Sequence, residues 1–65
     1  MSRYRDNTET LSGLVVRTSE KAVLFRNEHA EVWVPRSVCI DGDMVDQGDT
    51  DLVVQSWFAE KEGLL

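Results

Sequence analysis

The stretch Lys21-Ala-Val-Leu-Phe-Arg-Asn-Glu-His-Ala-Glu-Val-Trp-Val-Pro35 consists of two apolar runs joined by a polar connection, the pattern of a β-hairpin. Side chains alternate between the two faces of a strand, so Val23 and Phe25 point to one face and Leu24 points to the other. Both faces of the hairpin therefore carry apolar atoms. Because a two-stranded hairpin is marginal in water, the rest of the chain must cover it with further strands, a helix or a partner's surface.

The flanking segments predict two more strands, a loop and a short helix. Residues 12–18 are rich enough in β-branched side chains for a first strand, antiparallel to the hairpin. Residues 36–40 predict a single helical turn or an irregular crossing, with Val38 and Ile40 facing inward. Residues 41–51 hold five aspartates and two glycines, which predicts an exposed loop. Residues 52–56 predict a fourth strand. Residues 56–63 then predict a helix with its serine as N-cap and its glycine as the C′ residue.

These elements predict an α+β fold, in which a small antiparallel sheet of four strands forms a meander, with the option of curling toward a barrel, and a short C-terminal helix packs on it. A chain of 65 residues allows one small domain, which we place at residues 12–65. Residues 1–11 are polar and mixed in charge, and we expect them to be a flexible N-terminal arm.

The composition excludes several kinds of site. With one cysteine, Cys39, the chain cannot form an internal disulfide or a metal site built on paired cysteines, which suits a reducing cytoplasm. The N-terminus lacks the apolar core of a signal peptide, and no apolar run approaches the ~20 residues that span a bilayer. We therefore expect a soluble cytoplasmic protein with no membrane contact.

The charge is divided unevenly along the chain. Residues 1–36 hold six basic and five acidic residues, whereas residues 37–65 hold one basic residue, Lys61, against seven acidic ones. The net charge of the second part is thus -6, although that of the whole chain is -5. Because the phosphates of nucleic acid require a basic footprint, this distribution argues against direct binding to nucleic acid and favours a basic protein surface as the partner.

The aspartates of residues 41–51 are the first candidate site. A calcium loop needs acids at positions 1, 3 and 5, glycine at 6 and glutamate at 12, and counting from Asp41 the pattern fails at the last three, so we predict no metal. A solvated, turn-rich loop is the plainest interpretation. The alternative is an acidic surface that competes for a nucleic-acid-binding groove, since Asp41 and Asp43, like Asp49 and Asp51, alternate at about the spacing of phosphates if the backbone is extended.

Catalysis has little support in the sequence. His29 lies between Glu28 and Glu31, but no serine or second histidine is placed to complete a catalytic group, so a solvated loop histidine is expected. Cys39 has apolar neighbours and predicts a buried small hydrophobe rather than a nucleophile. We expect no enzyme and no cofactor.

Aromatic and arginine side chains leave an alternative open. Trp33 and Trp57 are either the largest parts of a small core or anchors of an interface, and we expect at least one to be partly exposed. Together with aromatic rings, basic residues near strand ends can form a stripe that binds single-stranded DNA: Arg17, Arg26 and Arg36.

Three segments carry a resemblance to known proteins: Ser19-Glu-Lys-Ala-Val-Leu24, Glu31-Val-Trp-Val-Pro-Arg-Ser37 and Trp57-Phe-Ala-Glu-Lys-Glu-Gly-Leu64. In this pattern, over about residues 14 to 65, the chain resembles small proteins that phages and prophages carry among their DNA-handling genes. Its size and acidity also resemble anti-CRISPR proteins, among them those that act on the type I-C system. That class has no common motif or fold, so no functional residue carries over. The resemblance implies binding to a CRISPR surveillance (Cascade) complex and prevention of target DNA capture.

The sequence thus predicts a non-enzymatic inhibitor, a monomer or weak dimer, that binds a basic complex through its acidic second half. The alternatives are a phage accessory domain that binds single-stranded DNA and a structural module that dimerises through a sheet edge. The predicted contact residues are seven acidic residues and a tryptophan: Asp41, Asp43, Asp46, Asp49, Asp51, Glu60, Glu62 and Trp57.

Overall fold

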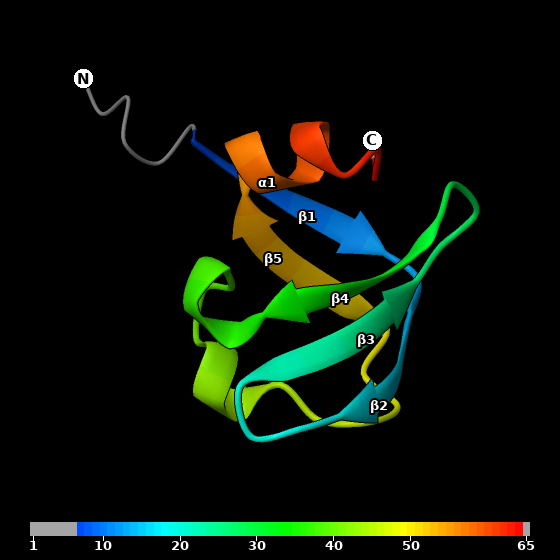
Figure 1. The fold of residues 1–65 in the computed structure, drawn as a ribbon, viewed down its shortest axis with the longest axis vertical. Coiled ribbons are helices and arrows are strands. Elements are labelled where there is room, and N and C mark those ends of the chain that lie inside the picture. The colour runs from blue at the N-terminus through cyan, green and yellow to red at the C-terminus, as the bar shows by residue number, and fades with distance from the viewer. Residues whose placement is uncertain (1–6, 65) are drawn as a thin grey trace.

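The computed structural model describes residues 7–64, and the structural statements below refer to these residues. Strands and a single α-helix are arranged as an α+β fold, which confirms the predicted class (Figure 1). The elements follow one another as β1 (Thr8–Ser12), β2 (Leu14–Thr18), β3 (Ala22–Arg26), β4 (Glu31–Pro35), the 3-10 turns η2 (Arg36–Val38) and η3 (Gly42–Met44), β5 (Asp51–Gln55) and α1 (Ser56–Lys61).

The strands form two antiparallel sheets, β2-β3-β4 and β1-β5, instead of one four-stranded meander, and they do not close into a barrel. The predicted hairpin is β3 and β4, and its faces are confirmed. Val23 lies opposite Val34, and both are fully buried. Leu24 lies opposite Trp33 on the outer face, where the indole is 51% exposed.

Strand β1 lies partly within the segment that we expected to be a flexible arm. Thr8–Ser12 pairs with β5, and Leu11 lies opposite Leu52 with both side chains buried. Thr-Glu-Thr-Leu-Ser has one large hydrophobe, so its own pattern barely indicates a strand. It is extended because β5 offers backbone donors and acceptors that must be paired. The remainder of the expected arm, residues 1–6, lies outside the described residues.

The chain passes from one sheet to the other at Gly13. Its amide donates to the carbonyl of Thr50 at 2.9 Å, and the amide of Val15 donates to that of Asp49 at 2.9 Å, so the segment before β5 is bonded to β2. A β-carbon at Gly13 would lie 2.3 Å from the carbonyl oxygen of Arg26, which leaves no room for a side chain. The chain therefore crosses from one sheet to the other at a position where only glycine fits.

The core lies between the two sheets and α1, and no polar side chain of the described residues is buried in it. The helix contributes Phe58 and Ala59, and beyond its end Leu64 is 1% exposed. The buried side chains are Leu11, Val15, Val23, Phe25, Val34, Val38, Cys39, Leu52, Val54, Phe58, Ala59 and Leu64.

The helix ends as predicted but begins differently. Gly63 has φ +71°, and the amides of Gly63 and Leu64 donate to the carbonyls of Glu60 and Ala59, a Schellman motif. At the start, Gln55 is the N-cap residue and Ser56 is already helical, so the predicted serine cap was wrong. The Ser56 hydroxyl is buried without a hydrogen-bond partner. No helix of the described chain is long and apolar enough to cross a membrane.

Residues 36–40 form the predicted helical turn, η2, and then run beside β5. Cys39 is 8% exposed and forms an isolated bridge with Val54, in agreement with the expected buried cysteine. The amide of Ile40 donates to the carbonyl of Val53 at 2.8 Å. The Ile40 side chain, which we expected to face inward, is 45% exposed, because only alternate residues of this extended segment face the core.

Candidate functional site

Residues 41–51, here called the aspartate loop, are held in place by the guanidinium of Arg36. Its Nη1 atom donates to the carbonyl oxygens of Gly42 at 2.6 Å and of Val45 at 3.0 Å. Its Nε atom donates to the carbonyl oxygen of Ser19, in the turn between β2 and β3, at 3.1 Å. A planar fork of donors is well suited to collecting several backbone carbonyls. The single side chain therefore fixes the first half of the aspartate loop to the three-stranded sheet.

The second half of the aspartate loop is held by a hydrogen bond within the loop and by another to β2. A carboxylate oxygen of Asp49 accepts a hydrogen bond from the amide of Asp46 at 2.9 Å, and the amide of Gly48 donates to the carbonyl of Val15 at 2.9 Å. Gly48 has φ +95°, which a residue with a side chain rarely adopts. Hydrogen bonds to backbone groups thus hold the aspartate loop in a defined conformation.

The loop carboxylates are mostly in solvent and form no ion pair with a lysine or arginine of residues 7–64. Only Asp49 is half-buried, whereas the other four aspartates are exposed: Asp41, Asp43, Asp46 and Asp51. Among the described residues the one ion pair within 4.0 Å is that of His29 with Glu28. Carboxylates without a nearby cation keep their full field at the surface, so this end of the molecule is an anionic surface.

The structure does not give these carboxylates the regular spacing of phosphates that we expected from an extended chain. Asp41 has φ 55°, a left-handed conformation, and Asp43 lies in the 3-10 turn η3. The carboxylate of Asp49 accepts a hydrogen bond from the amide of Asp46. A resemblance to DNA in this loop is therefore one of charge and not of geometric repeat.

The predicted contacts of the helix lie elsewhere. Helix α1 lies at the opposite end of the molecule from η3, so Glu60, Glu62 and Trp57 do not share a surface with the aspartate loop (Figure 1). Trp57 is 52% exposed, and its indole nitrogen donates to the side-chain oxygen of Gln55 at 2.8 Å. Both tryptophans are thus about half exposed, as expected for at least one. The predicted contact residues therefore belong to two separate surfaces, one on the aspartate loop and one on α1.

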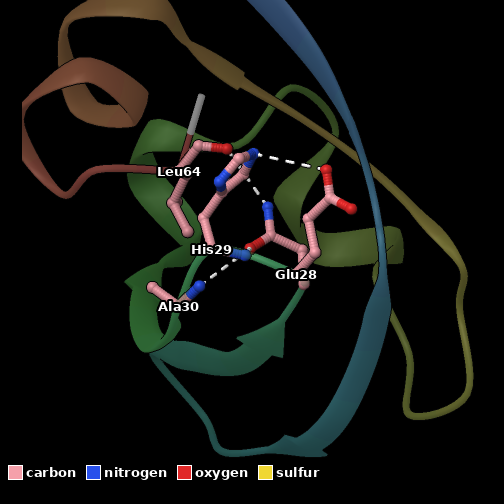
Figure 2. Close-up of polar contacts among 5 residues, drawn as sticks. Glu28, His29, Ala30 and Leu64 are labelled. Carbon is pink, nitrogen blue, oxygen red and sulfur yellow. Dashed lines mark hydrogen bonds and ion pairs between the residues drawn. The ribbon is translucent and has the colours of Figure 1, made fainter.

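His29 lies in the turn between β3 and β4. Figure 2 shows its imidazole beside Glu28, at 3.5 Å between Nε2 and the carboxylate oxygen. The turn itself is organised by Asn27, whose side-chain oxygen accepts from the amides of His29 and Ala30 at 2.8 and 3.0 Å. The amide nitrogen of the same side chain donates to the carbonyl of Leu64 at 3.1 Å, which ties the turn to the C-terminal segment.

A hollow of about 370 Å³ beside this turn brings hydroxyl groups near the histidine, which the sequence did not indicate. Thr10 and Ser12 of β1 line it together with Glu28 and His29. No hydrogen bond joins either hydroxyl to the imidazole in the described structure, and no three metal-ligating side chains of the described residues converge anywhere.

Cys39 is unsuited to act as a nucleophile. Burial raises the pKa of its thiol, and the positive charge of Arg36 lowers it only in part. The Sγ atom points at the carbonyl oxygen of Pro35, 3.6 Å away. The thiolate is the reactive form of cysteine, and a raised pKa disfavours it. The structure therefore indicates that Cys39 is a side chain of the core.

The arginines do not form the stripe that the sequence allowed. The guanidinium of Arg36 is committed to backbone carbonyls, which leaves Arg17 and Arg26 exposed on the sheet. Arg17 lies opposite Leu24, which in turn lies opposite Trp33. The outer face of β2-β3-β4 thus carries a short row of one arginine, one leucine and one tryptophan.

A groove that was not predicted from the sequence borders the aspartate loop. It has a volume of about 780 Å³ and lies between the turn at Glu20 and Lys21 and the turn η3. Pro35 and Met44 form its apolar walls, and Met44 is 77% exposed. The sequence feature that could have indicated this groove is Met44, a methionine within a run of aspartates and glycines.

Comparison of the chain with protein-family models, with curated proteins and with solved structures finds no match.

Proposed function

We propose that the protein is a non-enzymatic inhibitor that binds a basic nucleic-acid-binding protein through the aspartate loop, and that its target is a CRISPR surveillance complex. The observation that carries the proposal is the unpaired state of the loop: four exposed aspartates, with no described lysine or arginine within ion-pair distance of their carboxylates. A DNA-binding channel lined with lysine and arginine is the complementary surface.

The fold of the loop favours binding. Arg36 and Asp49 hold the two halves of the loop through side-chain hydrogen bonds to backbone groups, so little conformational freedom remains to be lost on association. Opposite charge on the two partners accelerates their encounter and makes binding sensitive to salt. An acidic loop that occupies a DNA channel blocks DNA without needing any chemistry of its own.

The choice of a surveillance complex as the target rests on the resemblance of the chain's size and acidity to anti-CRISPR proteins, together with the resemblance of residues 14–65 to phage proteins. A direct test mixes a purified type I-C surveillance complex with labelled target DNA and increasing amounts of the protein, and follows the complex by gel shift. The proposal predicts that the DNA is released as protein is added and that the protein co-migrates with the complex. DNA binding that persists at a large molar excess of protein would contradict it.

The second candidate function, binding of single-stranded DNA, has one observation in its favour. Arg17 and Trp33 lie on the exposed face of β2-β3-β4 with Leu24 between them, and a surface that carries both an arginine and an aromatic ring is a feature of single-strand binders. The same gel-shift assay with protein and single-stranded DNA alone, at low salt, separates the two functions. A salt-sensitive shift supports DNA binding, whereas the leading proposal predicts none.

A further inference from the structure

The groove beside the aspartate loop combines an apolar surface with a rim of carboxylates. Pro35 and Met44 lie in the groove, and the acidic residues around it are Glu20, Asp41 and Asp43. An apolar centre with a polar rim is the usual arrangement of a protein-binding surface. The groove is open, so a side chain or a short segment can enter from solvent.

Met44 is exposed at a position that the fold holds rigidly. The turn η3 that carries it begins at Gly42, where a β-carbon would lie 2.2 Å from the carbonyl oxygen of Arg36. The guanidinium of Arg36 bonds the carbonyls on both sides of Met44, those of Gly42 and Val45. A methionine left 77% exposed on a fixed turn stays available for contact and cannot fold back into the core.

The charge of the groove selects the kind of partner. Two basic residues line it, but Arg36 directs its Nε and Nη1 atoms to backbone carbonyls. These hydrogen bonds leave the positive charge of Arg36 in place, so the described lining of the groove carries three carboxylates against two cationic groups. This excess of negative charge repels an acidic segment and attracts a basic one.

We propose that the groove receives an arginine of a basic segment of the target protein. The methylene groups of that arginine pack on Met44 and Pro35, and its guanidinium reaches the carboxylates of Asp41 and Asp43. Long basic side chains bury their stems along apolar surface and keep the charged end near water or acids, and a guanidinium matches a carboxylate with two hydrogen bonds. The proposal rests on the proposed function and gives it a specific point of contact.

The test titrates the nitrogen-15-labelled full chain with a nona-arginine peptide at low salt and follows the amide signals by NMR. Two variants probe the groove, Met44→Ala for the apolar contact and Asp43→Asn for the charge. Two control variants lie outside the groove: Ile40→Ala removes an exposed hydrophobe of similar size, and Glu31→Gln removes an exposed charge at the start of β4, away from the aspartate loop.

The proposal predicts that the peptide shifts the signals of Gly42 and Met44 more than that of Trp57. Each groove variant weakens binding about fivefold to tenfold, and each control variant changes it by less than about twofold. Equal effects of groove and control variants would overturn the proposal, as would an absence of peptide binding.

This outcome is independent of the inhibition assay. If the protein fails to displace DNA from a surveillance complex while the groove variants still lose peptide affinity, the proposed function falls and the arginine-binding groove stands. If the protein displaces DNA and Met44→Ala displaces it equally well, the groove proposal falls and the inhibitor stands.

Discussion

Arg36 and Gly42 are locked together by two contacts of opposite kind. The guanidinium of Arg36 donates to the carbonyl oxygen of Gly42 at 2.6 Å, and the carbonyl oxygen of Arg36 lies 2.2 Å from the position that a β-carbon of residue 42 would take. Attraction and close approach together set the position of η3. The aspartate loop and the groove both depend on this pair.

Replacing Arg36 should destabilise the fold while leaving the core unchanged. Arg36→Ala removes the side-chain donor from the carbonyls of Ser19, Gly42 and Val45, and we expect a loss of about 2–3 kcal/mol in the free energy of unfolding. Arg36→Lys keeps the charge but cannot bond three carbonyls at once, so it should lose about 1–2 kcal/mol. Urea denaturation measures both. Arg17→Lys, at an exposed arginine, is the control and should change stability by less than about 0.5 kcal/mol.

Gly42→Ala should be more harmful than Gly48→Ala, although only Gly48 has a positive φ. At residue 42 the added carbon meets backbone at 2.2 Å, so η3 must move, at a cost of about 2–4 kcal/mol. At Gly48 nothing lies within 4 Å and only the φ of +95° opposes a side chain, at a cost of about 1–2 kcal/mol. Thermal unfolding of the two variants compares them, and the reverse order would show that η3 is not packed against Arg36.

The left-handed conformation of Asp41 gives a way to separate charge from stability. Asp41→Gly should raise the free energy of unfolding by up to about 1 kcal/mol, because glycine adopts φ 55° without strain. Asp41→Val should lower it by about 1–2 kcal/mol, since a β-branched residue is strained there. Denaturation midpoints test the order Gly above Asp above Val. Asp41→Gly also removes one loop carboxylate, so a stabilised variant that binds its target less well is expected.

The parts of the fold that follow from local pattern were predicted, and those that depend on distant contacts were not. Val23 and Leu24 face opposite sides because side chains alternate along any strand. Strand β1 was missed because Thr8–Ser12 has little hydrophobic pattern and becomes a strand through pairing with β5.

The candidate site shows the same division. The number and exposure of its aspartates could be predicted from composition, since turn-rich acidic segments remain in solvent. The groove could not, because it forms only when Arg36 reaches across to Ser19, 17 positions away in the chain, and to Gly42 and Val45. Nor could the separation of α1 from the loop, which follows from the path of β5 between them (Figure 1).

Stability should fall at alkaline pH through Cys39. Burial raises the pKa of its thiol in the folded protein, so the folded state keeps the proton to a higher pH than the unfolded chain does. Above the unfolded thiol pKa of about 8.5 the unfolded chain therefore binds fewer protons, and stability decreases as pH rises. Denaturation at pH 7 and at about pH 10 measures this loss. In Cys39→Ala the loss should be smaller, and an equal loss would exclude the thiol as its source.

The most direct test of the account compares two pairs of substitutions that remove the same charge from different places. Asp43→Asn with Asp46→Asn neutralises two exposed residues of the aspartate loop, and Glu28→Gln with Glu31→Gln neutralises two exposed residues at the β3–β4 turn. Each double variant is titrated into a type I-C surveillance complex bound to target DNA, and the concentration that releases half of the DNA is measured. We predict that the aspartate pair raises this concentration about tenfold and that the glutamate pair leaves it within about twofold of the wild-type value. Equal values for the two pairs would contradict the claim that the aspartate loop is the contact.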